Sequence, residues 1–163
     1  MTSLVSLATR TVLVVSMVGT GCTDASQKLV AHTDTAVLKL LPGLLERPDR
    51  VWWSEQTLGE PGGLGPTDRI LLVLLRFQKP RLDRALSHLA TQPTGRPTKV
   101  AVRTLAHFPS EARSGLQLDS EDSEFYSLSG PIYQGRGVGR SPYLDGFVAR
   151  IGEDRLLIRL FTR

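Results

Sequence analysis

Two stretches of the chain carry hydrophobic residues at helical spacing. The first stretch ends at Pro42-Gly43, and its apolar face consists of Leu29, Val30, Val37, Leu40 and Leu41. The second begins at Pro80, a residue suited to the first helical position, and ends before Pro93; its apolar face consists of Leu82, Ala85, Leu86 and Leu89. The spacing therefore predicts two helices, each with one face in the core.

Other stretches have the patterns of β-strands. Residues 70–75 form an unbroken apolar run, which favours a strand covered on both faces, with a buried helix as the alternative. Residues 99–103 alternate between polar and apolar positions, which predicts a half-buried strand that extends toward His107. Residues 51–53 are compatible with a strand or a helix. Four glycines and two prolines within residues 59–66 indicate a loop.

The C-terminal residues predict a β-hairpin, because the strand-like segments 144–151 and 156–162 flank Gly152-Glu-Asp-Arg155. A three-residue loop would place Arg155 and Arg159 on the same face as Ile151, so we expect a four-residue loop. That register makes an outer face of Arg155, Arg159 and Arg163. Together the patterns predict a small single α+β domain, with an antiparallel or mixed sheet, a C-terminal β-hairpin and two or three helices.

The N-terminus has a different pattern. Residues 11–23 are uncharged and follow Arg10, which is the only charge in the first 21 residues. A membrane-spanning helix needs about 20 apolar residues, so this run is too short for one. Its length, its preceding positive charge and the small residues at its end fit the apolar core of a secretory signal peptide.

The apolar run ends Gly19-Thr20-Gly21-Cys22, and Cys22 is the only cysteine in the chain. This ending resembles the lipobox of bacterial lipoproteins, although Gly19 stands where the family usually has an aliphatic residue. The resemblance implies that the Cys22 thiol is acylated with fatty acids such as palmitate and that the preceding peptide is removed. It also implies an exported protein, lipid-anchored in the bacterial cell membrane or outer membrane.

These features divide the chain into a signal peptide (residues 1–21), a lipidated tether (22–26) and one α+β domain (27–163). Loss of Arg10 with the signal peptide lowers the net charge from +4 to +3. An ordinary secretory signal with a chance cysteine and an uncleaved apolar N-terminus remain the alternatives.

The residues suited to catalysis or metal binding are sparse. A single cysteine excludes an internal disulfide and a multi-thiolate zinc site within one chain. His32, His88 and His107 fall on polar, mostly basic faces of separate predicted elements, so we expect solvated surface histidines, no metal and no cofactor. Residues 22–163 contain neither Gly-x-Ser-x-Gly nor Ser-x-x-Lys. Whether the protein is an enzyme stays uncertain, and the absence of catalytic motifs favours a non-catalytic role.

One glycine-rich segment is a candidate binding loop. Gly135-Arg-Gly-Val-Gly139 lacks the following helix and the Lys-Ser/Thr pair of a phosphate loop. All three tyrosines lie within residues 126–143, and tyrosine and arginine are favoured at interfaces. The candidate binding residues are therefore Tyr133, Arg136, Arg140 and Tyr143. The alternative is a glycine-rich connection whose tyrosines pack on the sheet.

These features favour a membrane-anchored envelope lipoprotein with a non-catalytic binding or structural domain. Its expected partners are the membrane, through acylated Cys22, and an envelope protein or anionic polymer; we expect no nucleic acid. One alternative is a small cell-envelope enzyme acting on cell-wall or anionic polymer substrates, and another is an unanchored secreted domain. A cleft that joins His107 to the 133–143 loop would favour the enzyme, whereas histidines on separate surfaces would favour the binding domain.

Overall fold

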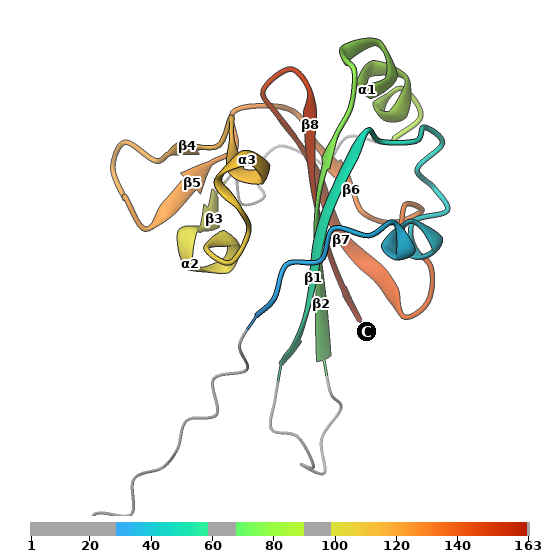
Figure 1. Cartoon of the computed structure of the whole chain (residues 1–163), viewed down its shortest axis with the longest axis horizontal. Coiled ribbons are helices and arrows are strands. Elements are labelled where there is room, and N and C mark those ends of the chain that lie inside the picture. The colour runs from blue at the N-terminus through green and yellow to red at the C-terminus, as the bar shows by residue number, and fades with distance from the viewer. Residues whose placement is uncertain (1–28, 59–67, 90–98, 163) are drawn as a thin grey trace, which may run out of the picture.

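A computed structural model describes residues 29–58, 68–89 and 99–162, and it contains two antiparallel sheets (Figure 1). The larger sheet has, in spatial order, β1 (Arg50–Leu58), β2 (Asp68–Arg76), β8 (Arg155–Thr162), β7 (Tyr143–Ile151) and β6 (Ile132–Gln134). The smaller sheet has β3 (Lys99–Ala101), β5 (Phe125–Ser127) and β4 (Gln117–Leu118). The helices are the 3₁₀-helix η1 (Ala36–Leu40), α1 (Lys79–Leu86), α2 (Val102–Leu105) and α3 (Ser110–Arg113). The predicted α+β domain with a C-terminal hairpin is confirmed.

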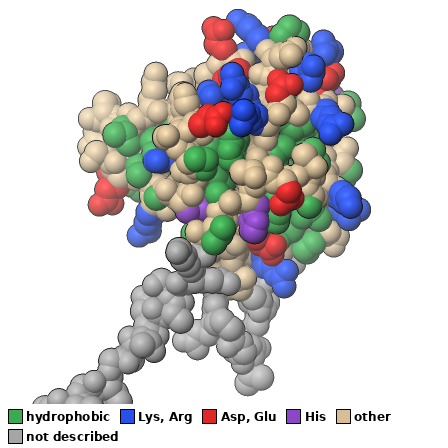
Figure 2. Space-filling model, viewed as in Figure 1, with side chains coloured by type: hydrophobic (Ala, Val, Ile, Leu, Met, Phe, Trp, Pro, Cys, Tyr) green, Lys and Arg blue, Asp and Glu red, His purple; other side chains and the backbone are tan. Residues whose placement is uncertain are grey.

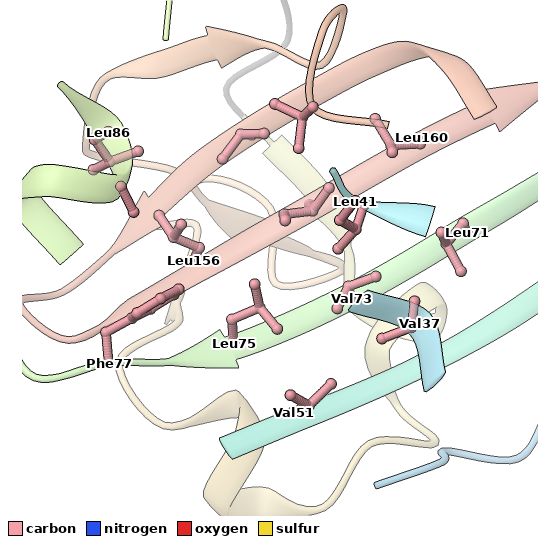
Figure 3. Close-up of a cluster of buried hydrophobic side chains, with 14 of the residues drawn as sticks. Val37, Leu41, Val51, Leu71, Val73, Leu75, Phe77, Leu86, Leu156 and Leu160 are labelled. Carbon is pink, nitrogen blue, oxygen red and sulfur yellow. The ribbon is translucent and has the colours of Figure 1, made fainter. Parts of the chain in front are cut away.

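The larger sheet is the middle layer of the domain. The smaller sheet, α2 and α3 lie on one side of it, and η1 and α1 lie on the other (Figure 1). The first core, on the η1 and α1 side, is built around Leu71, Val73 and Leu75, together with Leu156, Ile158 and Leu160 of β8 (Figure 3). The second core, on the side of the smaller sheet, is built around Ile70, Leu72, Leu74 and Leu157. The unbroken apolar run 70–75 is thus a strand covered on both faces, as its composition predicts.

The two predicted helices have different outcomes. α1 forms at the expected place, with Pro80 in its first turn and Leu82, Ala85 and Leu86 buried. The prediction of a helix beginning near residue 29 is wrong, because only residues 36–40 are helical. His32 instead pairs with the outer edge of β1: its N–H donates to the Trp53 carbonyl at 2.7 Å, and the Trp53 N–H donates back at 2.9 Å. This edge pairing holds the chain extended, and it leaves Val30 exposed.

The strand predicted to run toward His107 ends earlier than expected. β3 stops at Ala101, which is paired with Phe125, the first residue of β5. One further backbone hydrogen bond follows, from the Val102 N–H to the Glu124 carbonyl at 2.7 Å, and the chain then turns into α2. Leu105 and Phe108, on and just after this helix, enter the second core.

The hairpin of β7 and β8 has a three-residue loop, because Ile151 pairs with Arg155, so the expected four-residue loop is wrong. Arg155 and Arg159 therefore share a face with Ile151 and Phe147. The expectation assumed one buried face, but both faces of this hairpin are covered: Ile158 lies in the first core and Leu157 in the second. With apolar side chains on both faces, hydrophobic alternation does not determine the register.

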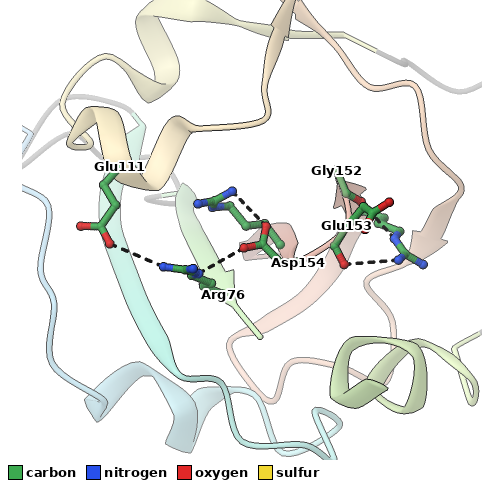
Figure 4. A network of polar contacts seen from close by, with 7 residues as sticks. Arg76, Glu111, Gly152, Glu153 and Asp154 are labelled. Carbon is green, nitrogen blue, oxygen red and sulfur yellow. Dashed lines mark hydrogen bonds and ion pairs between the residues drawn. The ribbon is translucent and has the colours of Figure 1, made fainter. Parts of the chain in front are cut away.

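Ion pairs tie the tip of this hairpin to its neighbours (Figure 4). The Asp154 carboxylate accepts hydrogen bonds from Arg76 of β2 at 3.1 Å and from Arg155 at 2.9 Å. Arg76 also approaches Glu111 of α3, with 4.0 Å between Nη1 and Oε1. Because most of these side chains are substantially exposed, each pair contributes at most about 1 kcal/mol. Their main effect is to connect the hairpin tip, the end of β2 and α3.

Candidate functional site

The candidate binding loop, residues 135–142, connects β6 to β7 and is packed against the first core. Val138 at its centre is fully buried. The backbone N–H of Gly43 donates to the Val138 carbonyl at 3.0 Å, and the N–H of Arg140 donates to the Leu40 carbonyl at 3.1 Å. These bonds fasten the loop to the end of η1. The loop therefore covers the first core, which is the structural alternative considered for it.

Two glycines allow this close packing. A Cβ atom on Gly135 would lie 2.7 Å from the carbonyl carbon of Gly146 and 2.9 Å from the backbone nitrogen of Phe147, and one on Gly139 would overlap the carbonyl oxygen of Tyr143. These are backbone atoms of β7, which cannot move aside as the end of a side chain can, so glycine is required at both positions. The glycine content of the loop thus reflects its close approach to the backbone of β7.

The four candidate binding residues separate into two buried or half-buried tyrosines and two exposed arginines. Tyr133, on β6, packs against the first core, and Tyr143, at the start of β7, is buried within it. Burial raises the pKa of the Tyr143 hydroxyl well above its usual range, and the Glu55 carboxylate adds to this effect. Arg136 and Arg140 remain exposed on the loop and make no ion pair among the described residues. Only the two arginines are thus presented outward for a ligand.

The third tyrosine lies elsewhere. Tyr126 is on β5 and belongs to the second core, where its hydroxyl accepts a hydrogen bond from Arg113 at 3.2 Å. Tyr126 therefore lies on the opposite side of the larger sheet from Tyr133 and Tyr143, and the three tyrosines form no common surface.

Cys22, the signal peptide and the tether lie outside the described residues. Among the described helices, none is both long and apolar enough to cross a membrane. The predicted lipidation thus continues to depend on the sequence pattern alone.

The three histidines lie apart, as expected, but one of them has an unexpected environment. His32 is exposed and stacks on Trp53, with 4.5 Å between ring centroids, and His88 is exposed, with its Nε2 2.8 Å from the Gly43 carbonyl oxygen. His107 is half-buried, and burial lowers the pKa of its imidazole. The expectation of a solvated His107 on a basic strand face is wrong, because α2 turns the chain toward the larger sheet.

His107 contacts a serine that sequence reasoning missed. Its Nε2 lies 2.7 Å from the hydroxyl oxygen of Ser54, a residue 53 positions away on β1. A serine and a histidine at this distance resemble a nucleophile and its base. However, Ser54 is only 1% exposed, and His107 Nδ1 is buried without a partner among the described residues. A substrate has no access to the hydroxyl, and no carboxylate orients the imidazole, so the pair acts as an interlayer hydrogen bond.

His107 and the 135–142 loop lie on opposite sides of the larger sheet. The loop inserts Val138 into the first core, whereas Phe108, the neighbour of His107, lies in the second. The structure therefore does not join His107 and this loop in one cleft. A shallow hollow does occur beside η1, and it is lined by Leu38, Leu41, Leu44, Leu45, Glu46, Arg47 and Pro48.

Charged side chains are distributed over the surface. On the face drawn in Figure 2, basic and acidic residues are interspersed, with no large area of one sign. Within residues 29–58, 68–89 and 99–162, no three or more histidine or acidic side chains are grouped so as to hold a metal ion. No protein-family model matches the chain, and neither a curated protein nor a solved structure matches it.

Proposed function

We propose that this chain is a bacterial envelope lipoprotein, held on a membrane by acylated Cys22, whose α+β domain acts by binding or structural contact without catalysis. The observation that carries the proposal is the position of the only cysteine, directly after an apolar segment that ends in small residues. Acyl transfer requires a thiol, and cleavage within the membrane favours small side chains before it.

The length of chain between Cys22 and the domain supports a position close to the membrane. The described structure begins at Leu29, seven residues after Cys22. Seven extended residues span at most about 25 Å. Two or more acyl chains at Cys22 would give stable anchoring, since one chain alone binds a bilayer only weakly. The domain would therefore meet its partners within a short distance of the bilayer.

The surface proposed for a partner is the outer side of the 135–142 loop. Arg136 and Arg140 are exposed there on a backbone that Val138 holds in place. Two exposed guanidinium groups on a packed backbone suit an anionic polymer or an acidic surface of an envelope protein, because arginine presents directed hydrogen bonds to carboxylate and phosphate groups.

The enzyme alternative has one observation in its favour, the 2.7 Å contact between Ser54 and His107. The burial of Ser54 and the unpartnered Nδ1 of His107 oppose it, so the non-catalytic proposal is preferred. The unanchored secreted alternative differs from the proposal only in the fate of Cys22, which an experiment resolves directly.

The experiment is expression of the full chain in a bacterial host that is fed a labelled fatty acid. The wild type is expected to take up label and to partition into the membrane fraction, and Cys22→Ser is expected to do neither. Thr23→Ser, one residue along the chain, is the matched control and should be labelled like the wild type. Absence of label on the wild type, or equal label on Cys22→Ser, would overturn the proposal.

A further inference from the structure

Arg159 occupies an unusual position on the middle strand of the larger sheet. It lies on β8 between Leu72 of β2 and Phe147 of β7, on the face that carries the second core. Because β8 is paired on both sides, its backbone is covered, and the exposed part of this half-buried residue belongs to the side chain. The guanidinium group thus lies at the border between the second core and solvent.

The charge of Arg159 has no counterpart in the described protein. Its side chain takes part in no ion pair and no hydrogen bond among the described residues, and its Nε is buried without a partner. The residue as a whole is half-buried, and its terminal nitrogens are not among the buried atoms that lack a partner. Asp145, two residues from Phe147 on the same strand face, accepts a hydrogen bond from the backbone N–H of Gly146.

Arg155 on the same strand face provides an internal comparison. Its Nε is also buried without a partner, but its Nη1 donates to Asp154 at 2.9 Å. The fold therefore supplies a carboxylate to one of two similarly placed guanidinium groups and leaves the other without one. A partly desolvated charge is unfavourable unless an opposite charge accompanies it.

The surroundings of Arg159 would accept an anion with an attached ring or apolar group. The guanidinium carbon lies 5.6 Å from the centre of the Phe161 ring, within the range of a cation–π contact. This contact orients the guanidinium group and places a half-buried aromatic ring beside it. Burial also lowers the pKa of Arg159.

We propose that Arg159 and Phe161 form a binding site for an oxyanion group, a carboxylate or a phosphate, carried by an external ligand. The two terminal nitrogens of Arg159 would hold the oxyanion as a bidentate pair, and the Phe161 ring would contact the body of the ligand. This site lies on the sheet face opposite the 135–142 loop, and it does not depend on acylation of Cys22. It is thus a second surface in addition to the one formed by Arg136 and Arg140.

Thermal unfolding of the full chain tests the site, because a ligand that binds only the folded state raises Tm. The probes are inorganic phosphate and galacturonate, each compared with chloride at equal ionic strength. Neutral galactose is included to detect a contribution from the sugar ring alone. Wild type is expected to gain at least about 2 °C in phosphate, galacturonate or both. The responding anion identifies whether the group is a phosphate or a carboxylate.

Arg159→Met removes the charge and keeps an unbranched side chain. This variant is expected to lose the anion-dependent rise in Tm completely, and in chloride to be at least as stable as wild type, since an unpaired, partly buried charge is gone. Arg103→Met, at an exposed arginine of α2 without an ion pair among the described residues, should keep the full rise. No rise in wild type with either anion, or a rise that persists in Arg159→Met, would overturn the site. Neither result bears on the labelling of Cys22.

Discussion

Replacement of Val138 by alanine tests whether the glycine-rich loop is a packed cover of the first core. Val138 is fully buried, and its neighbours Arg136 and Arg140 are exposed on the same loop. If the loop were instead loosely attached, truncating Val138 would change little. The substitution is conservative for the backbone, because the residue has no positive φ angle and its hydrogen bond to Gly43 uses only the carbonyl group.

The expected loss follows from the atoms that the substitution removes. Val138→Ala deletes the equivalent of two buried methylene groups, each of which contributes about 0.8 kcal/mol. The space left behind adds to this loss, because the surrounding core relaxes only in part. We therefore expect the free energy of unfolding to fall by about 2–3 kcal/mol. For a domain of this size, Tm should fall by roughly 5–10 °C.

Urea unfolding followed by circular dichroism measures this loss, with Arg136→Ala as the matched control in the same loop. The control should lie within about 0.5 kcal/mol of wild type, because its side chain is exposed. A Val138→Ala variant as stable as the control would refute the packed-loop interpretation. A changed m-value would indicate a different unfolded or native ensemble and would be examined before the energies are compared.

Two further predictions concern His107 and the exposed loop arginines. Because burial lowers the pKa of His107 in the folded protein, the unfolded chain binds the proton first, so the free energy of unfolding should decrease as the pH falls through about 6.5 toward the folded-state pKa. His107→Gln should remove this component from urea midpoints measured between pH 5 and 8, whereas His88→Gln should retain it; an unchanged profile in His107→Gln would contradict the assignment. Replacing Arg136 and Arg140 together by alanine should leave stability nearly unchanged and weaken binding to anionic envelope material in a sedimentation assay. Equal binding by wild type and the double variant would eliminate this surface as the contact.

The elements that sequence predicts well are those whose pattern reflects burial directly. The apolar run 70–75 has no polar face to turn toward solvent, so it predicts a segment covered on both sides. Pro80 marks the start of α1, and its apolar positions mark the face that is buried. The hairpin loop differs from the expected one because burial on both faces removes the hydrophobic contrast that normally selects a register. The expected helix near residue 29 does not form because pairing between His32 and Trp53 overrides local helical spacing.

The candidate site also contains features that local sequence patterns predict and features that they do not. The exposure of Arg136 and Arg140 could be predicted from their polarity and from the surrounding glycines. The contact between Ser54 and His107 joins residues 53 positions apart, so it depends on the placement of α2 against β1, which local patterns do not encode. The position of Arg159 is also a tertiary property, since it depends on a strand register that places this residue between Leu72 of β2 and Phe147 of β7.

Intact-mass and N-terminal analysis of the protein from bacterial membranes determines whether Cys22 is the acylated first residue. We expect a mature chain that begins at Cys22 and carries two or three fatty acyl groups, all of them lost in Cys22→Ser. A mature chain with an unmodified Cys22, or one that begins at another residue, would contradict it.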